Sequence, residues 1–110
     1  MEMVLKTIVL KGLSKTNTSE EEYDTEVVPS GKKWTVLEVR PYFSRQNSDV
    51  EAYLYMRTER FMEMNSLNAN AYQRPYPSDI EIPASVKLRL CGKTDGTSTD
   101  FVVEVVVSEE

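Results

Sequence analysis

The chain has 110 residues, 40% of them hydrophobic and 28% charged, which is typical of one globular domain over residues 1–110. It contains no histidine, which excludes Ser-His-Asp and Cys-His nucleophiles, imidazole metal ligands and histidine pH switches. The single cysteine, Cys91, excludes an intramolecular disulfide and a thiolate zinc site. With 13 basic and 18 acidic residues, a formal net charge of −5 and no basic cluster, nucleic acid is not expected as a partner.

The N-terminal quarter of the chain predicts two strands separated by a polar loop. Met3 to Lys11 is rich in Val, Leu and Ile and stops at Gly12, which predicts the first strand. A short edge strand is predicted over Tyr23 to Val28. The acidic residues between Glu20 and Glu26 fit a solvated edge protected by like charge. A calcium site is the alternative for this run, but it lacks both glycine and the spacing of a calcium loop.

The next part of the chain has the strongest strand signals. Pro29-Ser30-Gly31 predicts a turn before a long strand, Trp34 to Phe43. After a polar loop over residues 44–49, the four apolar residues Val50, Ala52, Leu54 and Met56 alternate with Glu51, Tyr53, Tyr55 and Arg57. This strict alternation predicts a strand with one face against the core.

The second half of the chain continues the all-β pattern. Phe61 to Met64 favours the return strand of a hairpin, with a short helix as the alternative, and Asn65 to Ser78 predicts a long loop. Ile80 and Ile82 precede Pro83, and further strands are predicted from Val86 to Cys91 and from Thr99 to Val107. Seven or eight strands and no clear helical pattern predict an antiparallel β-sandwich or barrel.

Two segments resemble small jelly-roll modules, many of which are components of phage and archaeal virus particles. The first is Val28 to Val36, a Pro-x-Gly turn that begins a long strand, and the second is Asp79 to Leu88. With the intervening hairpin and the valine-rich terminal strand, the resemblance covers about residues 27–107. Ser85 departs from the glycine that such modules often have there. The resemblance implies a jelly-roll fold and a structural or attachment role in an oligomer, and it implies no catalytic residues.

A tyrosine-bearing surface is predicted from the two central strands. If Leu37, Val39 and Phe43 face the core, Trp34, Val36, Glu38, Arg40 and Tyr42 face outward. If this strand pairs with the next one through the loop over residues 44–49, one surface collects a set of residues typical of protein interfaces: Arg40, Tyr42, Tyr53, Tyr55 and Arg57. The alternative is that these tyrosines only suit exposed sheet positions.

The first and last strands are apolar on both faces. Leu5 and Val9 alternate with Val4, Ile8 and Leu10, and the closing strand carries Phe101, Val103, Val105 and Val107 opposite Val102 and Val106. A sandwich in water normally leaves one face of each sheet polar. The pattern therefore predicts that an outer surface is covered, by a second copy of the chain or by loops of the same chain, and we expect a homo-oligomer.

Residues for catalysis are scarce. Glu38, Glu51, Glu81 and Glu104 lie on predicted strands, where alternating glutamate is what a solvated sheet face requires. Cys91 lacks a neighbouring base, and no cofactor site is predicted. We therefore expect a non-enzymatic protein. No signal peptide or membrane-spanning segment is predicted, so synthesis in the cytoplasm is expected, with incorporation into a virus particle as an option.

A carbohydrate-binding module is the main alternative function. Sandwiches often bind sugars through exposed aromatic rings flanked by amide and charged groups, and the loop over residues 65–78 supplies Tyr72, Arg74 and Tyr76 together with Gln73 and three asparagines. The competing interpretation is a surface loop fixed by its two prolines, with the tyrosines packed over one end of the sandwich.

Overall fold

The computed structural model describes residues 3–68 and 80–110, and over these residues the chain is all-β apart from one turn of 3-10 helix, η1 (Ser66–Asn68). The segment from Phe61 to Met64 is a strand, as predicted, and not a helix. The eight strands are β1 (Val4–Lys15), β2 (Glu21–Val27), β3 (Trp34–Phe43), β4 (Glu51–Met56), β5 (Glu59–Asn65), β6 (Glu81–Ile82), β7 (Lys87–Lys93) and β8 (Thr99–Glu109).

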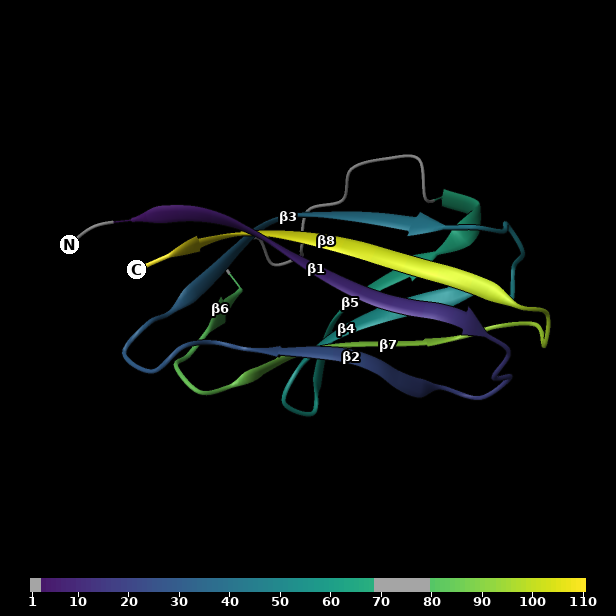
Figure 1. Cartoon of the computed structure of the whole chain (residues 1–110), viewed down its shortest axis with the longest axis horizontal. Helices are drawn as coiled ribbons and strands as arrows, with labels where there is room; N and C mark the ends of the chain where they lie inside the picture. The colour runs from purple at the N-terminus through teal and green to yellow at the C-terminus, as the bar shows by residue number, and fades with distance from the viewer. Residues whose placement is uncertain (1–2, 69–79) are drawn as a thin grey trace.

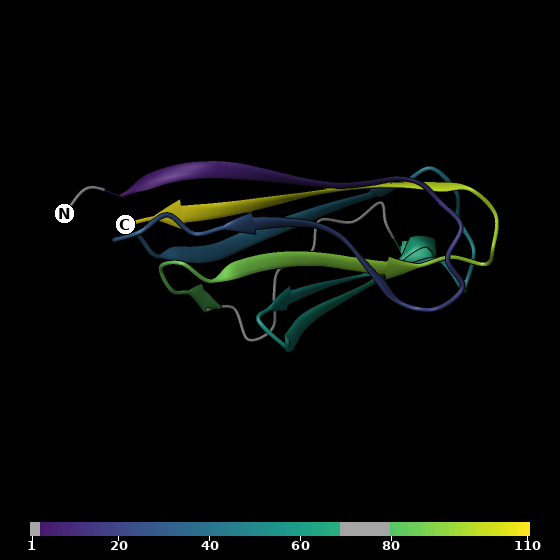
Figure 2. The ribbon, with the colours of Figure 1, turned by 60° about the horizontal axis from the view of Figure 1, so that its bottom comes forward.

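The strands form two four-stranded sheets (Figure 1, Figure 2). Sheet A has the order β1-β8-β3-β6 and sheet B the order β2-β7-β4-β5. The first strand pairs with the last, the second with the seventh, the third with the sixth and the fourth with the fifth, always antiparallel. This nested pairing is that of one long hairpin rolled up into two sheets, which is the strand order of a jelly roll. The predicted antiparallel, jelly-roll-like sandwich is confirmed.

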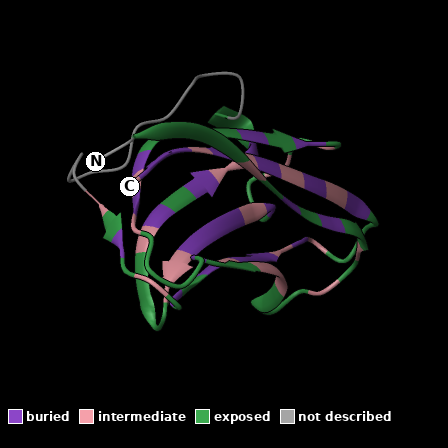
Figure 3. Ribbon diagram, turned by 60° about the vertical axis from the view of Figure 1, so that its left-hand side comes forward, coloured by how far each residue is buried: buried purple, intermediate pink, exposed green. Residues whose placement is uncertain are grey.

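The core lies between the two sheets and follows the predicted alternation. Ala52 and Leu54 of β4 are fully buried, and Figure 3 shows buried and exposed residues alternating along the strands. Phe101 of β8 is fully buried at one end of this core, with its ring centroid 4.9 Å from that of Tyr23 and 5.4 Å from that of Phe43. The aromatic rings therefore join both sheets at this end.

A β-bulge in β3 corrects the predicted orientation of its first half. The register with β8 shifts between Val36 and Glu38, so Leu37 is an extra residue. Consequently Trp34 and Val36 are buried and Leu37 is 42% exposed. The expectation that Trp34 and Val36 face outward and that Leu37 faces the core was therefore wrong. Beyond the bulge the prediction holds, because Val39 is buried.

Two glycines make room for the Tyr23 ring. A Cβ atom on Gly12 or on Gly92 would lie 2.5 Å from a carbon of this ring, and at Gly92 it would also lie 2.9 Å from the backbone oxygen of Glu51. The Tyr23 hydroxyl donates to Asn17 Oδ1 at 2.7 Å, and burial raises the pKa of this phenol to about 12. Gly12 pairs with Phe101 of β8, so the first strand continues through this glycine. The sequence predicted that the strand ends there.

We expect Gly92→Ala to lower the free energy of unfolding by about 1–3 kcal/mol, because the new methyl group overpacks the site between a ring and a rigid backbone oxygen. Chemical denaturation measures the loss. Gly31→Asn is the matched control: Gly31 has φ +78 in the turn closed by the Lys32 N–H to Pro29 oxygen bond, and no atom lies near its added Cβ. Asparagine tolerates that φ, so the control should stay within about 0.5 kcal/mol of the parent.

Candidate functional site

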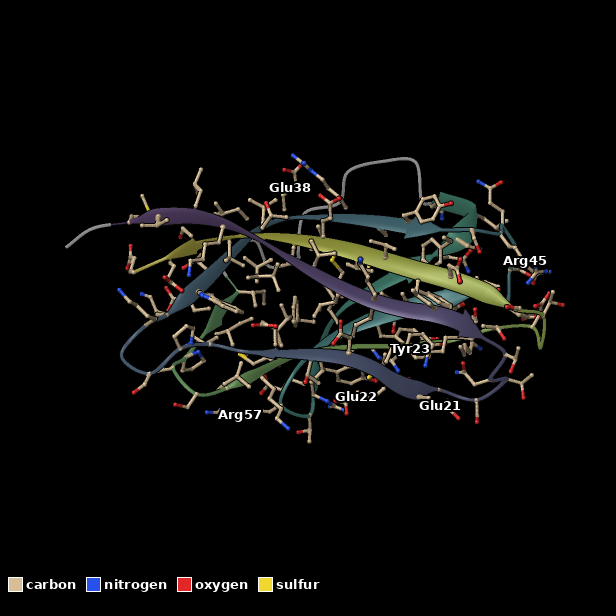
Figure 4. All side chains as sticks on the ribbon, viewed as in Figure 1. Glu21, Glu22, Tyr23, Glu38, Arg45 and Arg57 are labelled. Atoms are coloured by element: carbon tan, nitrogen blue, oxygen red, sulfur yellow. The ribbon has the colours of Figure 1, made fainter. Side chains whose placement is uncertain are left out.

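The predicted tyrosine surface is divided between the two sheets. The segment over residues 44–49 passes from β3 in sheet A to β4 in sheet B, so these strands do not pair. Arg40 and Tyr42 therefore lie on the outer face of sheet A, and Tyr53 and Tyr55 on the outer face of sheet B. Arg57 lies in the β4–β5 turn, on the sheet B side of the molecule in Figure 4, whereas Glu38 of β3 points to the opposite side.

The expectation of one shared surface was therefore wrong. The error arose because a polar loop as long as residues 44–49 can either close a hairpin or cross between sheets. In this jelly roll it crosses. Tyr42 is 57% exposed, but Tyr53 is buried. Tyr72, Arg74 and Tyr76 lie outside the described residues, and the carbohydrate site predicted there stays a prediction.

The outer face of sheet B carries a polar network, here called the tyrosine–arginine network. Its members are Glu20, Glu22, Glu51, Tyr53, Tyr55, Arg60, Glu63 and Arg89. The Arg60 guanidinium stacks on Tyr53, with its central carbon 3.9 Å from the ring centroid, and it donates to the Tyr55 hydroxyl at 2.8 and 3.0 Å. Arg60 also forms ion pairs with Glu20 and Glu63. This one cation therefore covers both tyrosine rings.

The remaining polar groups of the network are also paired. Tyr53 donates its hydroxyl to Glu51 at 2.5 Å, and Tyr55 donates to Glu20 at 2.5 Å. Arg89 lies 5.0 Å from the Tyr55 ring centroid and donates to Glu22 at 2.6 Å. Two residues of the acidic run, Glu20 before β2 and Glu22 within it, are thus paired with arginines of β5 and β7.

The electrostatics of this face favour neutral phenols and charged guanidinium groups. Burial, reinforced by the hydrogen bond to Glu51, raises the pKa of the Tyr53 phenol well above its usual range. Hydrogen bonding to Glu63 raises the pKa of the Arg60 guanidinium. The network therefore consists of neutral phenols and of arginines paired with glutamates. Such a surface is polar and internally satisfied, and it offers few free groups to a partner.

Sequence reasoning missed the two arginines that complete the network. Arg60 and Arg89 both pair in register with Tyr55, on either side of β4. Strand pairing places directly opposed residues on the same face, so the signal was present in the sequence once the strand order was known. The local alternation alone could not supply that order.

The outer face of sheet A is different in character and is here called the apolar face. The register of β1, β8 and β3 arranges it in four rows: Leu5–Ser108–Thr35, Thr7–Val106–Glu38, Val9–Glu104–Arg40 and Lys11–Val102–Tyr42, with Leu37 at the bulge. Leu5 is 68% exposed, and Val9 and Tyr42 are also exposed. Large apolar side chains therefore gather on a wet sheet surface.

The charges of the apolar face balance. Its four rows contain two cations, Lys11 and Arg40, and two anions, Glu38 and Glu104, which gives a formal sum of zero in a chain of net charge −5. Arg40 and Glu38 form an ion pair with a 3.1 Å separation. This face is consequently neutral, although the chain as a whole is acidic.

Metal-binding groups do not assemble in the described part of the chain. No set of three or more Cys, Asp and Glu side chains converges there as a metal site requires. Cys91 is buried, and this burial raises the pKa of its thiol, which lowers its reactivity. The same residues contain no helix long and apolar enough to cross a membrane.

Comparison of the chain with protein-family models, with curated proteins and with solved structures finds no significant match. The inference of function therefore depends on the chemistry of the two outer faces.

Proposed function

We propose that this chain is a non-enzymatic structural subunit that assembles with copies of itself through sheet A. The observation that carries the proposal is the contrast between the two outer faces. The tyrosine–arginine network closes sheet B with paired polar groups, whereas sheet A exposes Leu5, Val9, Leu37 and Tyr42 on a neutral surface. Burial of such apolar area is the main favourable term in protein association.

Electrostatics favour a second copy as the occupant of the apolar face. Copies of a chain with net charge −5 repel one another, and contact is least unfavourable where each copy is locally neutral. The apolar face is such a region. In a two-fold arrangement the same patch meets itself, so cations of one copy can face Glu38 or Glu104 of the other.

A virus particle is the setting that we propose for this assembly. Its support is the jelly-roll strand order together with the resemblance of residues 27–107 to virion modules. Jelly rolls also occur in lectins and cupins, so this part of the proposal is an analogy of fold. Self-assembly is the part that the chemistry of the surface supports directly.

Sedimentation equilibrium or light scattering at micromolar concentration tests the proposal. We expect a species whose mass is a multiple of the 12.6 kDa chain. Val106→Lys, in the middle of the apolar face, should lower that mass while the circular dichroism spectrum stays unchanged. Thr25→Lys makes the same kind of change on the outer face of sheet B and should leave the mass unaltered. A wild-type protein that sediments only at 12.6 kDa contradicts the proposal.

A further inference from the structure

The edge of sheet A at β1 exposes an unusual amount of apolar surface. Among the described residues, nine large hydrophobic side chains are exposed, and five of them lie between Met3 and Leu13. β1 is one of the two edge strands of sheet A and, with 12 residues, the longest of the described strands. Long apolar edge strands are templates for pairing with another chain, and proteins normally protect them.

The structure protects only one part of this edge. The backbone N–H of Lys11 donates to Asp24 Oδ2 at 2.9 Å and so points away from β8. Along a strand, successive residues direct their N–H and C=O groups to opposite sides, and the register from Val4 to Gly12 is continuous. Leu5, Thr7 and Val9 therefore present their backbone groups to the same edge as Lys11. Within residues 3–68 and 80–110, no hydrogen bond satisfies these groups of the three residues.

This unprotected half of the strand is held in place. Lys6 Nζ lies 3.0 Å from Glu109 Oε1, which fastens the N-terminal half of β1 to the end of β8. In Figure 1 and Figure 2 the N-terminal end of β1 and the C-terminal end of β8 project together from one end of the sandwich. The free edge is therefore an ordered strand that is ready to pair.

We propose that two copies pair antiparallel through the N-terminal halves of β1, so that their A sheets form one continuous eight-stranded sheet. The inference rests on the proposed function, because it specifies how copies of the chain first meet. Edge pairing supplies direction and register, and the two apolar faces then become one wider surface, through which further copies pack.

One register satisfies the free N–H and C=O groups of Leu5, Thr7 and Val9 in both copies. It places the two-fold axis at Thr7, so that Leu5 pairs with Val9 of the second copy, Thr7 with Thr7, and Val9 with Leu5. The Leu5–Val9 pairs bring exposed apolar side chains into contact, and the Thr7–Thr7 pair joins two threonines. Both kinds of cross-strand pair are favourable. Lys6 then lies opposite Ile8, so the lysines of the two strands do not face each other. The chain is self-complementary in this register.

Cysteine cross-linking tests the register. Residues paired across the axis have Cα atoms about 5.5 Å apart, which is within the range for a disulfide. We expect Thr7→Cys to form a covalent dimer on mild oxidation. Lys11→Cys is the matched control on the same face of the same strand, and the proposed register separates its two copies by about 27 Å. The wild-type chain, whose Cys91 is buried, should not cross-link.

A proline variant tests the hydrogen bonds. Thr7→Pro removes an N–H that points away from β8, a position where an edge strand tolerates proline. We expect the variant to keep its fold by circular dichroism and to lose edge pairing. Val106→Lys blocks the apolar face, so the single variant should remain a dimer of twice 12.6 kDa. The double variant, which also carries Thr7→Pro, should be monomeric.

The outcomes distinguish the two proposals. Edge pairing is supported if Thr7→Cys cross-links, Lys11→Cys does not, and Thr7→Pro gives monomers in the Val106→Lys background. If the wild-type protein assembles but Thr7→Cys fails to cross-link, or Lys11→Cys cross-links equally well, edge pairing is wrong and the proposed function stands. If the wild-type protein is monomeric, both proposals are overturned.

Discussion

Replacing Phe101 with alanine is expected to lower the free energy of unfolding by about 3–5 kcal/mol, the usual loss for a buried aromatic side chain. Phe101 is fully buried, and its ring contacts Tyr23 of sheet B and Phe43 of sheet A. Its removal leaves a cavity between the two sheets, because the surrounding strands are fixed by their hydrogen bonds and collapse only partly. Equilibrium denaturation in urea, followed by tryptophan fluorescence, measures the change.

The matched control for Phe101→Ala is Val27→Ala. Val27 is 45% exposed at the end of β2, and truncation of an exposed side chain usually changes stability by no more than about 0.5 kcal/mol. Equal losses for the two variants would contradict the burial of the Phe101 ring between the two sheets. The Phe101 side chain is buried in the core and Val27 lies in sheet B, so neither side chain belongs to the apolar face or to the edge from Leu5 to Val9. The comparison therefore does not depend on assembly.

The alternation of side chains made most of the strands predictable. In β4 each second residue is apolar, and Ala52 and Leu54 are buried while Met56 is half-buried, because period-two burial is what a strand against a core requires. The closing strand followed the same rule: Phe101, Val103 and Val105 are buried and Val102 is not. A local pattern is sufficient here because the core imposes it residue by residue.

The neighbours of each strand were not predictable from the same signal. Alternation says which side of a strand is buried, but not which strand lies beside it, and the loop after Phe43 contains no residue that distinguishes a hairpin from a crossing between sheets. Tyr42 and Tyr53 were therefore placed together and are in fact on opposite outer faces. The bulge at Leu37 added a second error, since one inserted residue inverts the faces on its N-terminal side.

The same limitation explains why the tyrosine surface predicted from the sequence is not the surface that we propose for assembly. Tyrosines on β4 are typical of an interface, but Arg60 and Arg89, from the strands on both sides of β4, lie over their rings. The hydroxyls of Tyr53 and Tyr55 donate to glutamates. The apolar residues on the outer side of β1 and β8 gave the more useful signal, because exposure of apolar side chains to water is energetically unfavourable. Our proposals depend on that second signal.

The second large effect is expected at Trp34, where Trp34→Ala should cost about 3–5 kcal/mol of unfolding free energy at neutral pH. Trp34 is buried, and its indole Nε1 donates to Glu109 Oε2 at 2.8 Å. This hydrogen bond, with a further contribution from Lys6, lowers the pKa of the Glu109 carboxyl below its usual value of 4.5. The alanine variant loses both the packed ring and the donor.

The pH dependence separates these two losses. Because the pKa of Glu109 is lowered in the folded state, the ionised carboxylate stabilises the fold above pH 4.5, and this stabilisation disappears as the pH falls through the folded-state pKa. Trp34→Phe retains an aromatic ring but has no donor, so the pKa of Glu109 should rise toward 4.5 and the loss of stability in acid should become smaller. Denaturation curves at neutral pH and at acid pH, with Glu109→Gln as the reference for a side chain that cannot ionise, measure this difference. An unchanged acid dependence in Trp34→Phe would mean that Lys6 alone stabilises the carboxylate, and the indole would then contribute only its packing.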